Sequence, residues 1–354
     1  MAADRTQSES ADSRYFSFGR FLRQRFGTRV YRVTIDAGFT CPNVDGTVAV
    51  GGCVYCDNRS FSPNRRLPRQ TIRDQVARGI ALLQKRYRAD KFIAYFQAAT
   101  NTYAPVDKLK RLYDEALDHP NIVGLAIGTR PDCVPDPVLD LIEDYARRYY
   151  VCLELGLQTI HDRSLEWMNR GDTFASFVDA VGRCRGRDLD VCAHVILGLP
   201  GESHADMMAT ADALASLPVD AVKIHNLHVV RDTPLEKMYA DGQVRMFTFE
   251  EYVQVVCDFL ERLPASMVIQ RLSGDAPPKY LVAPEWCLNK QALLEAIRHE
   301  LVRRDSRQGP TVPNRPAFNK FFPSWGTHSA ADFRIMDDHR TNFHVFVCSL
   351  LPRL

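Results

Sequence analysis

The sequence has no long apolar run and no marked excess of charge of either sign. Its 354 residues are 45% hydrophobic and 25% charged, with a formal net charge of +2. No stretch approaches the roughly 20 apolar residues that span a bilayer. The first residues, MAADRTQSESADSR, also lack the hydrophobic core of a signal peptide. We therefore expect a soluble cytoplasmic protein with no membrane partner and a disordered segment over residues 1–14.

A second pair of closely spaced cysteines is also missing. The chain has ten cysteines, which a reducing cytosol would keep from pairing as five disulfides. Three of them, Cys41, Cys53 and Cys56, crowd into residues 36–62 with the spacing C-x11-C-x2-C. The other seven stand singly and are expected to be small buried side chains: Cys133, Cys152, Cys184, Cys192, Cys257, Cys287 and Cys348.

Three neighbouring thiols suggest a metal centre with an open position. A structural zinc site needs four ligands, so zinc would require a distant fourth ligand such as His194 or His225. Three thiolates instead suit a [4Fe–4S] cluster with one iron left open. Gly51 and Gly52 would let the backbone approach such a cluster closely. Both alternatives remain open at this point.

The stretch from Arg29 to Met267 alternates β-rich and helical runs. Such alternation predicts βαβ units and a parallel sheet, and six or seven units favour a barrel over an open sheet. No G-x-G-x-x-G follows the first strand, which argues against a dinucleotide-binding fold. The predicted strands are 30–36, 91–97, 121–129, 150–156, 189–198, 219–227 and 266–270, and the helical runs are 69–87, 105–117, 136–148, 173–185 and 204–216.

This pattern divides the chain into a barrel over residues 15–270, a following segment over 271–309 and an irregular tail of unknown role over 310–354. Within the second part, residues 271–286 read as a loop and 289–305 as one amphipathic helix. In parallel α/β folds the loops after the strands form the active-site face. The cysteine loop follows the first strand and is therefore expected on that face.

Seven sequence blocks carry a resemblance to a known family. They are GFTCPNVDGT, GGCVYC, YFQAATNTYAP, GTRPDC, LELGLQT, HVILGLPGE and GDAPPKYLVAPEW, in this order along the chain. They resemble the radical S-adenosylmethionine (SAM) enzymes, in the branch of YhcC/YtqA-like proteins and the catalytic subunit of Elongator. The resemblance implies an α/β fold with a partial (βα)6 TIM-type barrel and extensions at both ends. It also implies a [4Fe–4S] cluster and reductive cleavage of SAM to a 5′-deoxyadenosyl radical.

The same resemblance implies site residues. Cys41, Cys53 and Cys56 would bind the cluster, although the common spacing in the superfamily is C-x3-C-x2-C. Tyr55 would lie near the SAM adenine and Gln97 near its amino group. Packing, or hydrogen bonds to loop backbone, is the alternative role for these two side chains.

Further polar residues end later strands. By resemblance, Glu154 and Gln158 lie on a strand that contacts SAM, and Arg130 could pair with a carboxylate or phosphate through its planar fork. Alternation along the sixth strand places Lys223 and His225 on one face, predicted to be the barrel interior. There they could meet the substrate or carry a proton, and a satisfied core histidine is the alternative.

The substrate is less clearly indicated. The stretch SRYFSFGRFLRQRFGTRVYR interleaves six arginines with aromatics, which suits RNA phosphates and unpaired bases but equally suits an amphipathic helix packed on the barrel. The resemblance implies tRNA modification at a wobble uridine, with an electron donor such as flavodoxin or ferredoxin. A radical SAM enzyme acting on a protein or small metabolite, and a non-catalytic Fe–S or zinc protein, are the alternatives. The oligomeric state is left open.

Overall fold

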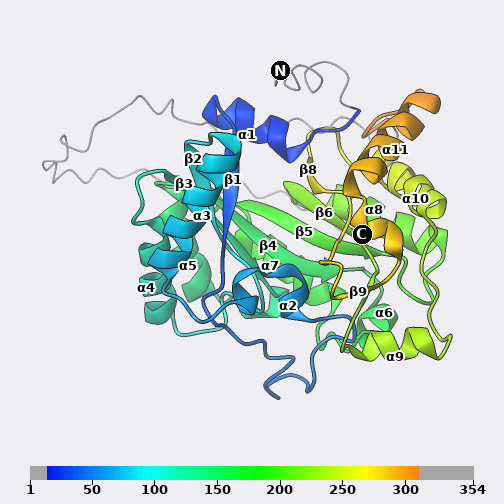
Figure 1. Cartoon of the computed structure of the whole chain (residues 1–354), viewed down its shortest axis with the longest axis horizontal. Coiled ribbons are helices and arrows are strands. Elements are labelled where there is room, and N and C mark those ends of the chain that lie inside the picture. The colour runs from blue at the N-terminus through cyan, green and yellow to red at the C-terminus, as the bar shows by residue number, and fades with distance from the viewer. Residues whose placement is uncertain (1–13, 311–354) are drawn as a thin grey trace, which may run out of the picture. The chain divides into compact units, whose positions relative to one another are not determined.

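The computed structural model describes residues 14–310. The predictions for residues 1–13, residues 311–354 and Cys348 lie outside this range. A seven-stranded sheet forms the centre, and all its strands run parallel in the order β1-β2-β3-β4-β5-β6-β8 (Figure 1). The seven predicted strands are confirmed as β1 Val30–Ile35, β2 Lys91–Phe96, β3 Ile122–Thr129, β4 Tyr150–Gln158, β5 Asp190–Leu197, β6 Ala221–Asn226 and β8 Val268–Arg271.

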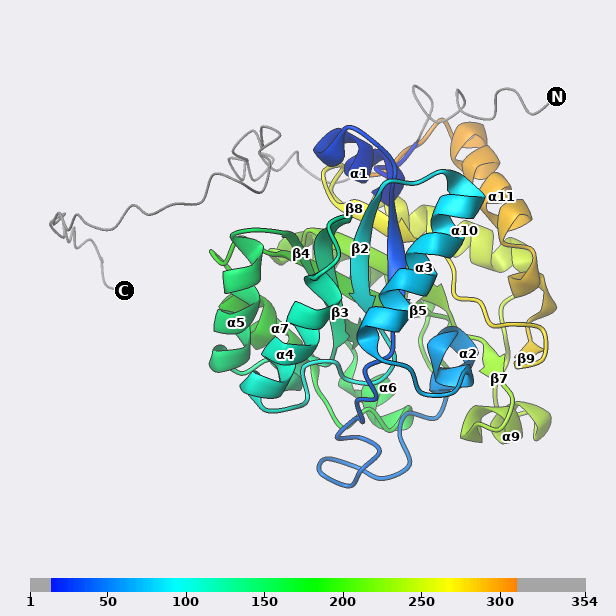
Figure 2. The ribbon, with the colours of Figure 1, turned by 60° about the vertical axis from the view of Figure 1, so that its left-hand side comes forward.

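Helices connect successive strands and cover the outer face of the sheet (Figures 1 and 2). Because β1 and β8 are the two edges, six βα units and a seventh strand make the open barrel that was expected. No described helix is long and apolar enough to cross a membrane. The helices are α1 Phe18–Phe26, α2 Asn58–Phe61, α3 Ile72–Tyr87, α4 Val106–Leu117, α5 Asp136–Ala146, α6 Asp162–Trp167, α7 Phe174–Cys184, α8 His204–Ser216, α9 Pro234–Ala240, α10 Phe249–Glu261 and α11 Lys290–Arg303.

Strand alternation separates an apolar outer face from a polar inner face. On β4, Val151 and Leu153 belong to the main core beneath the helices, as do the next alternate residues of the strand. Between them, Glu154 and Gln158 face inward and line a cavity. Since successive side chains of a strand point to opposite faces, one strand supplies both the hydrophobic core and the polar interior.

The amino-terminal helix closes one end of the barrel. Phe18, Phe21 and Phe26 pack against residues at the beginnings of the strands, including Val30 and Tyr150. Figure 2 shows α1 at the end of the strands opposite to the cysteine loop. The arginine-rich and aromatic stretch is therefore the packed amphipathic helix, and its aromatic rings are not displayed for stacking on bases.

The segment after the barrel is more ordered than expected. Residues 271–286, predicted as a loop, contain β9 Leu281–Ala283, which pairs antiparallel with β7 Val229–Val230. The prediction missed β9 because a three-residue strand is too short to show a period of its own. The amphipathic helix of 289–305 is confirmed as α11.

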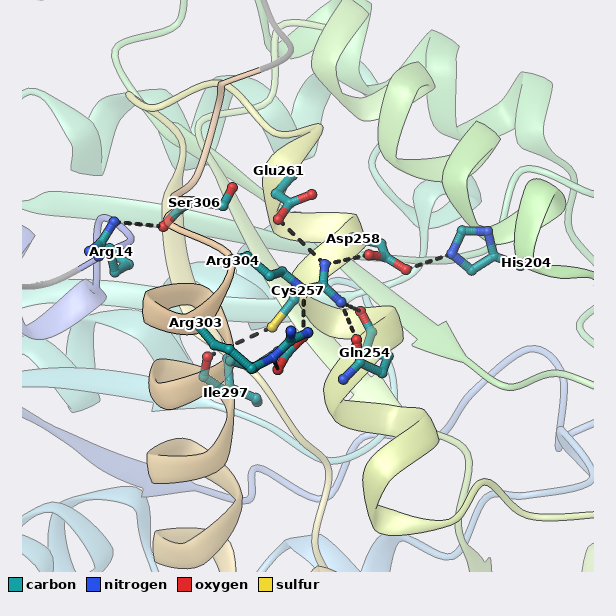
Figure 3. Close-up of polar contacts among 11 residues, drawn as sticks. Arg14, His204, Gln254, Cys257, Asp258, Glu261, Ile297, Arg303, Arg304 and Ser306 are labelled. Carbon is teal, nitrogen blue, oxygen red and sulfur yellow. Dashed lines mark hydrogen bonds and ion pairs between the residues drawn. The ribbon is translucent and has the colours of Figure 1, made fainter.

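Ion pairs anchor the far end of α11 to the barrel. Arg304 binds Asp258 on α10 at 2.5 Å and Glu300 on its own helix at 2.7 Å. The same Asp258 accepts a hydrogen bond from His204 on α8 at 2.7 Å (Figure 3). The contacts of Asp258 thus connect three helices and fix the direction of α11.

Candidate functional site

A cavity of about 910 Å³ lies inside the barrel and opens beneath the cysteine loop. Its volume is within the range of ligand-binding pockets. The lining contains all ten residues that the sequence predicted for the site: Cys41, Cys53, Cys56, Tyr55, Gln97, Arg130, Glu154, Gln158, Lys223 and His225. The structure therefore brings together residues from the cysteine loop, the loops after β2 and β3, and strands β4 and β6.

The cysteine loop is held by the segment that follows α6. Asn43 is fully buried; its amide donates to the Asn169 carbonyl at 2.5 Å and contacts the Cys53 sulfur at 3.5 Å. Asn169 in turn donates to the Gly52 carbonyl at 2.8 Å. Gly51 and Gly52 both have a positive φ, a conformation that glycine adopts without a Cβ clash. These hydrogen bonds and glycine conformations define the shape of the loop.

The three thiols are free and differ in exposure. Cys53 is buried, Cys41 is half-buried and Cys56 is exposed toward the cavity. The Cys56 side chain is exposed to the cavity, but protein surrounds the cavity and limits its contact with bulk water. This desolvation, together with the neighbouring Cys53 and Cys41, raises the pKa of the Cys56 thiol to about 12. Three thiolates in one place therefore need positive charge beside them.

Arg170 supplies one such charge. Its guanidinium lies 4.0 Å from the Cys53 sulfur and donates to the Gly156 carbonyl at 2.9 Å, while no described residue is a hydrogen-bond partner of its Nε. A Cβ at Gly156 would lie 2.8 Å from an Arg170 nitrogen, so the absence of a side chain at 156 makes room for this arginine.

The donor set fits an iron–sulfur cluster better than a single metal ion. Within residues 14–310, no group of three or more His, Cys, Asp or Glu side chains is arranged to hold one ion. His194, a possible fourth zinc ligand, forms a hydrogen bond with Glu154 at 3.0 Å. A four-iron cluster holds its thiolates further apart than one ion does and uses sulfur ligands, which suits cysteines spread along a cavity wall.

A buried ionic network forms deeper in the cavity. The Glu154 carboxylate has no exposed surface and pairs with Arg32 at 2.9 Å, with Lys223 and with His194. Lys223 also donates to the Tyr95 hydroxyl at 3.0 Å. Burial alone would raise the pKa of Glu154, but the charges of Arg32 and Lys223 hold it well below its usual range. The carboxylate is therefore ionised, and Arg32, Lys223 and His194 are its partners.

Arg130 is engaged in a similar way. Its guanidinium binds Asp132 through two nitrogens at 2.8 and 2.6 Å and donates to the carbonyls of Arg170 and Gly171 at 2.7 and 2.9 Å. These bonds use four of its five N–H donors. The geometry favours a positioning role, in which Arg130 fixes the segment that carries Arg170, over direct contact with an anionic ligand.

The remaining predicted residues, Gln97, Gln158 and Tyr55, line the cavity in different surroundings. Gln97 donates to the Phe61 carbonyl at 3.3 Å, near the mouth. Gln158 sits at a bulge of β4 with φ 72°. Tyr55 packs on an apolar cluster that includes Met168 and Ile196.

The inward face of β6 is confirmed. Lys223 and His225 both line the cavity, and the His225 ring lies 5.5 Å from that of His194. The Nε2 of His225 is buried and has no hydrogen-bond partner among residues 14–310. Burial, reinforced by the charge of Arg271, holds the pKa of His225 well below its usual value, so the imidazole is neutral at pH 7.

The lining residues that sequence reasoning missed include Asn43, Arg170, Arg271 and Lys290. Asn43 lies within the cysteine loop, and its closeness to the cysteines in the sequence could have identified it as a site residue. Arg170 follows α6, at a position that strand-end reasoning does not reach. Arg271 ends β8 and Lys290 begins α11, and only the fold brings these two beside the barrel interior.

Comparisons with known proteins agree with this geometry. A family profile described as the Radical SAM superfamily matches residues 47–214, and one described as the Radical_SAM C-terminal domain matches residues 219–303. The chain is 41% identical to the uncharacterized protein YtqA of Bacillus subtilis (strain 168) over 303 residues, covering 85% of this chain and 93% of YtqA. It is 40% identical to YhcC of Escherichia coli (strain K12), covering 77% and 87%.

More distant similarities cover part of the matched proteins. A tRNA uridine(34) acetyltransferase of Methanocaldococcus jannaschii is 28% identical over 173 residues, which is 48% of this chain and 31% of that protein. The solved structure of an archaeal Elp3 from Methanocaldococcus infernus superposes with a TM-score of 0.61 at 19% identity. That match covers 79% of this chain and 64% of the Elp3 chain, and it confirms the fold.

Proposed function

The chain belongs to the radical SAM superfamily, in the family of YtqA and YhcC, and from that membership we propose that it is an enzyme that modifies tRNA at a wobble uridine. In this proposal Cys41, Cys53 and Cys56 hold a [4Fe–4S] cluster, and SAM occupies the cavity beside it. Electrons come from a small carrier such as flavodoxin or ferredoxin.

The observation that supports the cofactor assignment is the convergence of three free cysteines on one cavity. The cysteines come from a loop at the carboxyl ends of the strands, and polar side chains of β2, β4 and β6 line the same space. The thiolate donors, the Arg170 charge and the shape of the loop all fit a cluster. When bound, the cluster and SAM supply a reductive C–S cleavage that yields methionine and a 5′-deoxyadenosyl radical, which removes a hydrogen atom from the substrate.

The protein positions and shields this chemistry. Arg170 places a positive charge beside Cys53, and Arg130 fixes the backbone on which Arg170 stands. Gln97, Gln158 and Tyr55 lie on the wall near the cysteines and would orient SAM. Deeper in the barrel, Lys223 and His225 face the remaining space, where a proton could be exchanged with the substrate.

Two considerations support tRNA as the substrate. The relatives include a tRNA uridine(34) acetyltransferase, which shares 28% identity over about half of this chain. In addition, the cavity lining carries many more basic than acidic side chains, and a positive cavity attracts a polyanion. The α1 arginines do not support an RNA substrate, because the aromatic residues between them pack against the barrel.

Anaerobic reconstitution tests the cofactor part. We expect wild-type protein to bind four iron and four sulfide and to release 5′-deoxyadenosine when reduced with SAM, and we expect Cys53→Ala to lose both properties. Cys257→Ala is the matched control, because this cysteine is buried at α10 beside α11, away from the cavity. Wild-type protein that carries zinc in place of iron would refute the proposal.

Nucleoside analysis tests the substrate. tRNA from a deletion strain should lack one wobble-uridine modification that the parent contains, and a plasmid copy should restore it while the Cys53→Ala copy should not. Unchanged tRNA in a strain whose enzyme releases 5′-deoxyadenosine would redirect the search to a protein or small-metabolite substrate.

A further inference from the structure

Positive charge dominates the wall of the cavity. Its lining contains seven basic residues, Arg32, Arg66, Arg130, Arg170, Lys223, Arg271 and Lys290, but only two acidic ones, Glu154 and Asp275. Arg32 and Lys223 share Glu154, Arg130 is paired with Asp132, and Arg170 faces Cys53. These partners leave Arg66, Arg271 and Lys290 as the lining cations with the least compensation: Arg66 lies over the Tyr280 ring, and Arg271 and Lys290 lie on the side of the cavity near Asp275.

Arg271 and Lys290 have a weak acidic partner. The carboxylate of Asp275 lies 3.8 Å from the Arg271 guanidinium, and both side chains are partly exposed. Lys290 makes no ion pair with any of residues 14–310. Exposed pairs at such distances contribute little, so two cations compete for one loosely held carboxylate.

The pKa shifts of neighbouring groups reflect this excess charge. Burial lowers the pKa of Lys290, and the charge of Arg271 lowers it further, with Asp275 opposing. Arg271 also lowers the pKa values of His225 and His228, after burial as the main cause in each. A bound anion would relieve this repulsion.

Neutral hydrogen-bond donors lie on the same side. His225 and His228 pack against Gly274, where a Cβ would lie 3.3 Å from the first ring and 3.0 Å from the second. The Nε2 of His225 has no hydrogen-bond partner in the described part of the chain, and the ring is neutral, so one of its nitrogens carries a proton to donate.

The end of α11 adds to this field. Lys290 is its first residue, so the positive end of a 14-residue helix lies at the cavity wall. The opposite end of α11 is tied to α10 through Arg304 and Asp258 (Figure 3). The helix therefore presents its amino terminus in a fixed position.

We propose that Arg271 and Lys290, with His225, form a subsite for an oxyanion of the substrate, a carboxylate or a phosphate group. The subsite rests on the proposed function, since it binds the molecule from which the radical would take hydrogen. It would hold the substrate by its charged end against the segment after β8, with the reactive part directed toward the cysteines. A substrate without a negative charge would gain no binding affinity from this side of the cavity.

Calorimetric titration of the anaerobically reconstituted, SAM-bound protein tests the subsite directly. Inorganic phosphate and acetate are titrated separately, with chloride at matched ionic strength as the blank. Arg271→Gln should raise Kd by about tenfold, as for the loss of a charge-assisted bond, and Lys290→Gln should raise it less. Stronger binding of phosphate would identify a phosphate group as the anchored end of the substrate, and stronger binding of acetate would identify a carboxylate.

Two further variants control for general charge and for folding. Asp275→Asn removes the competing carboxylate and should lower Kd, which a misfolded protein would not do. Lys279→Gln removes an exposed charge of the same segment that does not line the cavity, and its Kd should match the wild type. Equal affinities for wild type, Arg271→Gln and Asp275→Asn, or no titratable binding to wild type, would overturn the subsite. Release of 5′-deoxyadenosine by the wild type, measured separately, reports on the proposed function alone.

Discussion

The two ends of the barrel are built from the same strands but have opposite chemistry. At the beginnings of the strands, α1 inserts Phe18, Phe21 and Phe26 into an apolar cluster, and Phe18 and Leu22 line the adjoining part of the cavity. At their carboxyl ends, the cysteine loop and the segment after β8 surround a polar cavity. The first end contributes stability, because its side chains are satisfied by each other. The carboxyl end contains thiols and cations whose charges no described neighbour fully compensates. Uncompensated charge of this kind is typical of a ligand-binding site.

The largest effect should come from the cysteine end. Cys53→Ala should lower bound iron and 5′-deoxyadenosine release by at least about a hundredfold, because the remaining two thiolates hold a cluster poorly. The melting temperature before reconstitution should change little, since the loop is held by Asn43 and Asn169. Iron analysis, turnover and a thermal scan check the three parts. Retention of full iron and turnover would contradict the assignment of Cys53.

Glu154 lies between the two ends and should matter most for stability. Glu154→Ala would leave Arg32 and Lys223 buried without their shared carboxylate, which typically costs about 3–5 kcal/mol. Urea unfolding at pH 7 measures this loss. Asp212→Asn, which removes an exposed pair with Arg262, should cost less than about 1 kcal/mol.

The same carboxylate predicts a pH dependence. Its pKa is well below the usual value in the folded protein, so the folded state binds fewer protons than the unfolded state over that interval. The Glu154 contribution is therefore complete above the unfolded pKa of about 4.3 and is lost as pH falls toward the folded pKa. Unfolding curves of wild type and Glu154→Gln should converge as the pH falls below about 4. A constant difference down to pH 2 would argue that the network is not ionic.

At the closed end, Phe21→Ala should lower the free energy of unfolding by about 2 kcal/mol, because a half-buried ring leaves the cluster beneath α1. Iron content of the folded protein should stay at the wild-type level. Loss of the cluster in this variant would break the proposed separation between a structural end and a functional end.

The smallest effect is expected at Arg170. Arg170→Gln removes the positive charge beside Cys53 and should make the cluster about tenfold harder to reduce, which is about 59 mV for one electron. A spectroscopic redox titration without SAM measures this shift, which a purely structural residue would not produce. Arg170→Lys should restore most of the potential. Equal reduction potentials for Arg170→Gln and Arg170→Lys would show that the charge at this position does not affect the cluster, and Arg170 would then have a packing role only.

Much of the architecture could be predicted because it depends on local pattern. The seven strands appeared as β-rich runs with turn residues around them, and their order along the chain implied a parallel sheet. The inward face of β6 followed from alternation alone, so Lys223 and His225 were placed correctly. The short strand β9 was missed because it exists only through its pairing with β7.

The roles of the arginines show where sequence reasoning reached its limit. Arg130 was expected to meet a ligand, yet its fork is used by Asp132 and two carbonyls. Arg170 drew no attention in the sequence, yet it faces the cysteines. Every arginine has the same five N–H donors. Whether an arginine has a structural role or binds a ligand therefore depends on the residues that folding places beside it.

By itself, the sequence determined the parallel α/β barrel, the cysteine loop at its active face and the resemblance to radical SAM enzymes. Those features depend on the period of apolar side chains, on glycine conformation and on the spacing of three thiols. Only the tertiary structure decided that the arginine-rich helix α1 packs against the beginnings of the strands, that Glu154 pairs with two cations, and that Arg271 and Lys290 line the same cavity. These outcomes join residues far apart in the chain, and local propensity carries no information about such contacts.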